Sequence, residues 1–132
     1  MEVNGQEKVK VGLVKNLLNK CKYSLDGLIY CFKNETSFLL EAIAAILIII
    51  LGIFFDIEFV EWVISLGSLM LISITELINT AIEATVDMVT KEYNPLAKIA
   101  KDCASAATGI MGILATLANL IIFIPYFIGL FV

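Results

Sequence analysis

Residues 63–87, "VISLGSLMLISITELINTAIEATVD", decide the fold, because a mostly apolar run leads directly into acidic and amide side chains. On a helix, which turns about 100° per residue, Glu76, Asn79, Glu83 and Asp87 fall within about 80° of arc. Three carboxylates and one amide therefore share one face. The apolar run predicts a helix that enters a membrane, and the polar face predicts a chemical role for its continuation.

The composition of the whole chain is that of a membrane protein. Of its 132 residues 60% are hydrophobic, and the mean hydropathy of +0.94 is far above that of soluble domains. Further apolar runs at Ala42–Phe55 and from Cys103 to Val132 are long enough to span a membrane when extended by their neighbours. We therefore expect one domain over 1–132, with membrane helices over about 38–55, 60–90 and 95–130. Residues 1–33 lack the features of a secretory signal, so we expect the N-terminus to be retained.

The segment before the first span predicts an amphipathic helix over about 8–33. From Val14 to Phe32, apolar residues recur at the spacing of one helix face, and the opposite face is rich in lysine. Such a helix can lie in the membrane interface with its lysines directed to anionic headgroups. Packing against neighbouring subunits is the alternative, and both arrangements can hold together.

The lysines predict how the chain is oriented. Six of the nine precede the first span and three lie between the second and third, whereas the loop around residues 56–61 contains only acids among its charged residues. By the positive-inside rule, the N-terminus and the 88–102 loop are cytoplasmic, and Asp56, Glu58, Glu61 and the C-terminus lie outside. In the 88–102 loop, Asn94 is a suitable N-cap and Pro95 a suitable first helical residue, so the third span is expected to begin there.

A polar face inside a membrane needs compensation. An ionised side chain near the middle of a membrane costs roughly 2.5 to 3.5 kcal/mol. Depth, metal ions or partner residues on other helices could offset this cost, and a solvated helix end is the plainest alternative. Three spans are too few to enclose the face, so a homo-oligomer is expected. Other polar residues are expected at the same level: Asn34, Glu35 and Glu41 near the first span, and Lys101, Asp102 and Ser105 at the start of the third.

These residue types suit phosphoryl transfer, although they suit ion transport equally well. Carboxylates can hold magnesium, a lysine can meet a phosphate, and a glutamate can take a proton from an attacking hydroxyl. A proton- or cation-conducting bundle would also place acids on a helix face. Histidine is absent, which excludes His-based nucleophiles and most zinc sites, and no GxxxxGK[ST] or GxGxxG loop is present. The three cysteines lack CxxC spacing and are expected to be structural.

Three motifs resemble those of a known family. "ELINTAIEATVD" (76–87), "EYNPLAKIAKD" (92–102) and "NET" (34–36) closely resemble the bacterial integral-membrane diacylglycerol kinases, a family that includes the undecaprenol kinases. The resemblance extends over about residues 15–130. It implies a homotrimer of chains that each have a surface helix and three membrane helices, with active sites shared between subunits at the cytoplasmic face of the bacterial inner membrane. It further implies direct transfer of the ATP γ-phosphoryl group, with Mg²⁺, to a lipid alcohol, and no nucleic acid partner.

The resemblance also implies roles for individual residues. Glu76 resembles the general base, Glu35 and Glu83 the metal ligands, and Asn79 a residue that positions the reacting groups. The implied ATP contacts are Tyr23, Glu35, Glu83, Glu92, Asn94, Lys101 and Asp102; the implied lipid contacts are Ser24, Glu41, Glu76, Asn79 and Ser105; Asn34 and Asp87 are supporting positions. Asn94 stands where relatives often have histidine, and Lys15 or Asn16 where they often have arginine.

The motifs differ in the lipid that they indicate. "NETSFLLE" (34–41) and "KDCASAA" (101–107) are similar to diacylglycerol kinases, whereas "NPLAKIAKD" (94–102) is nearer to undecaprenol kinases. Diacylglycerol is therefore the expected acceptor, with undecaprenol as the alternative.

Overall fold

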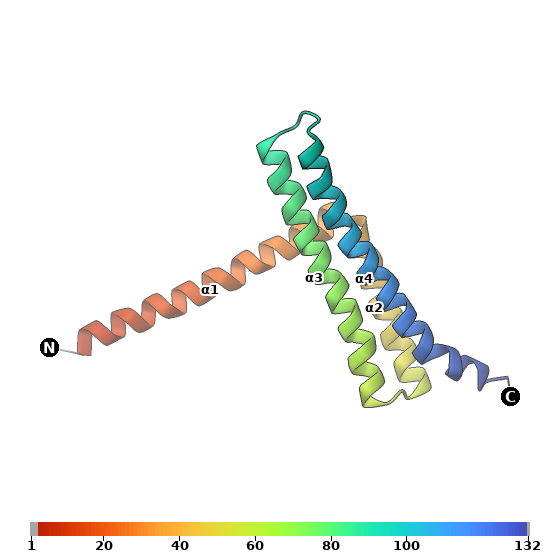
Figure 1. Cartoon of the computed structure of the whole chain (residues 1–132). Coiled ribbons are helices and arrows are strands. Elements are labelled where there is room, and N and C mark those ends of the chain that lie inside the picture. The colour runs from red at the N-terminus through yellow and green to blue at the C-terminus, as the bar shows by residue number, and fades with distance from the viewer. Residues whose placement is uncertain (1–2, 132) are drawn as a thin grey trace. The chain divides into compact units, whose positions relative to one another are not determined.

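The computed structural model describes residues 3–131, with side chains from residue 14 onward, and this part of the chain is helical apart from short connections. Its helices are α1 (Val3–Asn34), α2 (Thr36–Phe55), α3 (Phe59–Val89) and α4 (Pro95–Ile128) (Figure 1). The last three are each long and apolar enough to cross a membrane. The expected all-α membrane fold, with one N-terminal helix and three spans, is confirmed.

The chain divides into two units between Asn34 and Glu35. The first unit contains α1, which begins at Val3 and is therefore longer than the expected range of 8–33. Val14, Leu17 and Leu18 are exposed along it, which agrees with an apolar face that needs a cover. The structure does not describe the side chains of Lys8 and Lys10, two of the lysines expected on the opposite face of this helix. The location of α1 in the membrane interface stays a prediction.

The second unit contains α2, α3 and α4. In Figure 1, α3 and α4 lie side by side as a long hairpin, and α2 packs alongside the part of α3 that is nearer the 56–58 connection. Because α2 has 20 residues and α3 has 31, the hairpin continues past α2 toward the 90–94 loop. One end of this unit is therefore built from three helices and the other from two.

Local sequence signals explain where these helices start and stop. Asp56 adopts a left-handed conformation, with φ of 52°, and the next backbone N–H, of Ile57, donates to the Gly52 carbonyl at 3.1 Å. This is the hydrogen-bond pattern that commonly closes a helix C-terminus. At the start of α4, Oδ1 of Asn94 accepts hydrogen bonds from the N–H groups of Leu96 and Ala97, so the predicted cap at this position is confirmed.

A small apolar core holds the three helices together near the 56–58 connection. Ile48, Ile57, Ile122 and Phe123 are buried there. Gly52 is also required in this region, because a Cβ atom at this position would lie 2.5 Å from the Trp62 ring. The absent side chain lets α2 approach the start of α3 closely. This contact sets the height of α2 relative to α3, and so it determines which of their polar residues meet.

Candidate active site

The acidic face of α3 forms as the sequence predicted. Glu76, Asn79, Glu83 and Asp87 lie on one uninterrupted helix. Nδ2 of Asn79 donates to Oε1 of Glu83 at 3.1 Å, so these two side chains meet one turn apart. The first three residues are half-buried, whereas Asp87 is exposed. Burial therefore decreases along the face toward the 90–94 loop.

Glu41 of α2 joins this face through Ser73 of α3. The Ser73 hydroxyl donates to Oε2 of Glu41 at 2.6 Å. The Glu41 and Glu76 carboxyl groups are near enough for their charges to interact. Two of the predicted lipid contacts, Glu41 and Glu76, are thus brought together from two helices. Ser73 was not predicted as a site residue, although it lies one turn before Glu76, and that spacing was a signal that could have identified it.

The hydrogen bond to Ser73 also fixes the level of the remaining acids. Because Glu41 is level with Ser73 and α2 begins at Thr36, only a little over one turn earlier, Glu83 and Asp87 lie beyond the start of α2. They belong to the part of the hairpin that α3 and α4 form without α2. The site therefore changes from a half-buried end at Glu41 and Glu76 to an open end at Asp87.

At the open end, charged residues of α4 meet α3. Nζ of Lys101 lies 2.5 Å from Oδ1 of Asp87, and Lys98 forms an ion pair with Asp102 within α4. Asp87, which the resemblance implied only as a supporting position, is in this structure the carboxylate partner of Lys101. Exposed ion pairs of this kind contribute little to stability, so their effect is to orient the lysine and aspartate side chains.

Within the described part of the chain, no hydrogen bond or ion pair joins the other predicted site residues to this cluster. The backbone N–H of Glu92 donates to Oγ1 of Thr90, and the side-chain oxygen of Asn94 caps α4. Ser105 is exposed on α4 and Glu35 is half-buried directly before α2. Their predicted contacts with nucleotide, metal or lipid stay predictions.

Three further predicted residues lie on α1. Tyr23 is exposed, and the side chains of Ser24 and Asn34 donate to the carbonyl oxygens of Lys20 and Tyr30 in their own helix. These contacts are internal to α1. The predicted roles of these three residues therefore stay predictions.

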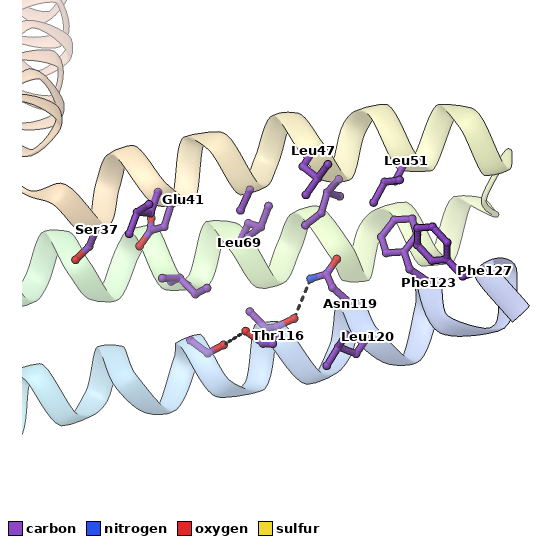
Figure 2. A pocket seen from close by; sticks show the side chains of 16 residues that line it. Ser37, Glu41, Leu47, Leu51, Leu69, Thr116, Asn119, Leu120, Phe123 and Phe127 are labelled. Atoms are coloured by element: carbon purple, nitrogen blue, oxygen red, sulfur yellow. Dashed lines mark hydrogen bonds between the residues drawn. The ribbon is translucent and has the colours of Figure 1, made fainter.

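A groove of about 680 Å³ extends along the span from Glu41. Figure 2 shows α2 and α4 on its two sides, with Leu69 of α3 between them. Its lining is mainly aliphatic and aromatic, and Glu41, Ser37, Thr116 and Asn119 supply the polar groups. Nδ2 of Asn119 donates to Oγ of Ser68 on α3 at 3.2 Å, a pair that was not predicted. The size and lining suit a hydrocarbon chain whose polar end lies near Glu41.

The donor set at the site fits a magnesium ion that arrives with a nucleotide. Within the described side chains, no group of three Asp, Glu, His or Cys residues could hold a metal by itself. Magnesium is usually held by one or two carboxylates together with substrate phosphates and water. Glu83 uses Oε1 to accept from Asn79, which leaves Oε2 for a further ligand. Carboxylate oxygens are the ligands that this hard cation prefers.

Comparison with known proteins identifies the family. The prokaryotic diacylglycerol kinase family matches residues 22–123, a range that contains every predicted site residue. The chain belongs to the prokaryotic diacylglycerol kinase family. The chain is therefore a lipid kinase, and phosphoryl transfer from ATP is its type of reaction. This confirms the resemblance that the sequence motifs indicated, and it favours the kinase interpretation over the ion-conducting bundle.

Named relatives within this family have two different lipids in their names. The chain is 37% identical over 93 residues to the undecaprenol kinase of Bacillus subtilis (strain 168), which covers 70% of this chain and 76% of the relative. It is 36% identical over 91 residues to the diacylglycerol kinase of Escherichia coli (strain K12), a match that covers 69% of this chain and 75% of the relative. It is 40% identical over 93 residues to the diacylglycerol kinase of Helicobacter pylori (strain ATCC 700392 / 26695), a match that covers 70% of this chain and 73% of the relative.

Proposed function

We propose that this chain phosphorylates diacylglycerol to phosphatidic acid at the cytoplasmic face of the bacterial inner membrane, using MgATP. The observation that supports this most directly is the grouping of Glu41 and Glu76 at the end of an apolar groove. Such a groove accommodates acyl chains, while the two carboxyl groups meet the polar end of the lipid. The acids and lysine of the open hairpin end are then on the nucleotide side.

In the proposed reaction Glu76 is the general base. It takes the proton of the lipid hydroxyl as that oxygen attacks the γ-phosphorus of ATP, and ADP leaves. Asn79 holds the adjacent Glu83 by a hydrogen bond and positions the reacting groups. Direct transfer is preferred to a phosphoenzyme, because no histidine or obvious activated nucleophile is present in the sequence.

Glu35 and Glu83 are the proposed magnesium ligands. When bound, the ion neutralises negative charge on the phosphates of ATP. Lys101 and Asp102 are the proposed nucleotide contacts at the open end, with Tyr23, Glu92 and Asn94 as further contacts. Ser24 and Ser105 are proposed to contact the lipid. Asn34 is a supporting position, and Asp87 supports the site by orienting Lys101.

We also propose that the active sites are completed by neighbouring chains in a homotrimer. In the described chain, Glu41, Glu76 and Glu83 are half-buried, but only 11–17% of the most apolar 18-residue stretch of each span is buried. Helices of other subunits could cover these residues from the sides that α2 and α4 leave open. The lysine distribution supports a cytoplasmic location for the N-terminus and the 90–94 loop.

The test is a lipid kinase assay with the purified full-length protein, labelled ATP, and either dioleoylglycerol or undecaprenol. We expect faster transfer to dioleoylglycerol, loss of transfer when magnesium is chelated, and recovery when magnesium is restored. Equal or faster phosphorylation of undecaprenol would overturn the choice of lipid in favour of the alternative. Absence of transfer to both lipids would overturn the proposed activity.

A further inference from the structure

Ser73 links α2 to α3 at the end of the groove. Its Oγ lies 2.6 Å from Oε2 of Glu41 and 3.3 Å from the carbonyl oxygen of Leu69 in its own helix. A hydroxyl group has a single proton to donate, so the much shorter contact identifies Glu41 as the main acceptor. Ser73 thereby fixes one oxygen of Glu41 from a neighbouring helix.

The second oxygen of Glu41 is left without a partner. Oε1 is buried and has no hydrogen bond within the described part of the chain. Buried polar atoms in proteins are nearly always paired, so this atom is a place where the site is incomplete. Because Glu41 also lines the groove, a molecule that occupies the groove can supply the missing partner.

The neighbouring Glu76 indicates which chemical group could be the partner of Oε1 of Glu41. Glu76 lies about one turn after Ser73 on α3, so Glu41, which is bonded to Ser73, meets α3 close to Glu76. A hydroxyl group can donate one hydrogen bond and accept two. A lipid hydroxyl can therefore donate its one proton to Oε1 of Glu41 when the lipid binds beside Glu76.

We propose that Ser73 is a positioning residue for the acceptor lipid, because by holding Oε2 of Glu41 it directs Oε1 to the lipid hydroxyl beside Glu76. This inference rests on the proposed function and adds a residue to it. Ser73 itself does not touch the reacting atoms. Its loss should weaken lipid binding while leaving the nucleotide end of the hairpin unchanged.

The test compares side chains of the same shape at position 73. Initial rates are measured with purified full-length protein against dioleoylglycerol in mixed micelles and, separately, against ATP. We expect Ser73→Val to raise the KM for dioleoylglycerol about five- to tenfold, with kcat and the KM for ATP changed less than about twofold. Ser73→Thr keeps the hydroxyl and should restore the lipid KM. Thr75→Val is the control, because the Thr75 hydroxyl bonds to the Leu71 and Ile72 carbonyls.

A double-mutant cycle separates positioning from general damage. If Ser73 acts through Glu41, then Ser73→Val should add no further change to the lipid KM of Glu41→Ala. An additive effect, an unchanged lipid KM in Ser73→Val, or an equal rise in the KM for ATP would overturn the proposal.

Equilibrium binding of radiolabelled dioleoylglycerol gives the same comparison without turnover. Failure of the protein to phosphorylate any lipid would refute the proposed function. The ratio of lipid affinities between Ser73→Thr and Ser73→Val would still decide the role of Ser73. We expect the threonine variant to bind about five- to tenfold more tightly, and equal binding would refute the positioning role.

Discussion

The Tyr126 hydroxyl, near the end of α4, donates a 2.6 Å hydrogen bond to Oε2 of Glu61 in the first turn of α3. The same oxygen accepts the backbone N–H of Glu58 at 2.8 Å, as part of the capping box that begins α3. One carboxylate therefore joins the end of α4 to the start of α3. This contact lies at the end of the unit that is opposite to the acidic face.

Removing the Tyr126 hydroxyl should loosen this end without affecting catalysis. We expect Tyr126→Phe to lower the midpoint of thermal unfolding by a few degrees, because Glu61 loses one of its donors. Unfolding followed by circular dichroism in detergent would measure the change. Tyr93→Phe is the matched control, since Tyr93 is highly exposed. Equal midpoints for the two variants would contradict a stabilising role for the Tyr126 contact.

Filling the space at Gly52 should destabilise the packing of α2 on α3. The added Cβ atom of Gly52→Ala would lie 2.5 Å from the Trp62 ring, and overpacking of this kind costs about 1 to 3 kcal/mol. Unfolding by denaturant would report the loss of stability. Gly67→Ala is the control, because no described atom outside its own helix surroundings lies within 4 Å of a Cβ at that position. A similar stability for both variants would argue against the close approach at Gly52.

Changing Glu76 or Glu83 to glutamine should impair different parts of the reaction. Glu76→Gln should reduce kcat about 100-fold or more with little change in ATP binding, because only the general base is removed. Glu83→Gln should instead raise the concentrations of Mg²⁺ and ATP that are needed. Steady-state kinetics at several magnesium concentrations would separate the two effects. Near-normal turnover of Glu76→Gln would refute its role as base, and a change confined to lipid affinity in Glu83→Gln would refute its metal role.

The ion pair between Asp87 and Lys101 should affect nucleotide use. We expect Lys101→Ala to raise the KM for ATP about tenfold or more, because a charged contact to phosphate is lost. Asp87→Asn should have a smaller effect of the same kind, since the lysine is kept but no longer held by a charge. Kinetics with ATP as the varied substrate would test both, with the exposed Lys91 changed to alanine as control. An unchanged KM for ATP in Lys101→Ala would contradict the proposed contact.

Several features were predictable from sequence because the signals that specify them are local. The start of α4 depends on Asn94 and Pro95, whose capping and backbone preferences need no tertiary contact. The acidic face of α3 follows from helix periodicity, and the contact between Asn79 and Glu83 is the direct result. The spans follow from composition. In the structure α1 begins at Val3, five residues before the expected start.

The contacts between helices were not predictable in the same way. Ser73 meets Glu41 across 32 residues of sequence, and Tyr126 meets Glu61 across 65. Each pairing depends on how far one helix is shifted along another, and the helix end at Asp56 together with packing at Gly52 determines that shift. A pattern within one helix contains no information about this shift. Asp87 could for the same reason be placed on a face without its partner being known.

The different lengths of α2 and α3 relate the active site to the thickness of the bilayer. A helix of 20 residues is about 30 Å long, which equals a typical hydrocarbon core, whereas 31 residues reach about 46 Å. When α2 matches the hydrocarbon core, roughly one third of α3 projects into the headgroup region and the water beyond it. Glu76 then lies close to the level at which a glycerol backbone resides. A thicker or thinner membrane would shift this carboxylate relative to the lipid hydroxyls, so hydrophobic mismatch would become a determinant of turnover.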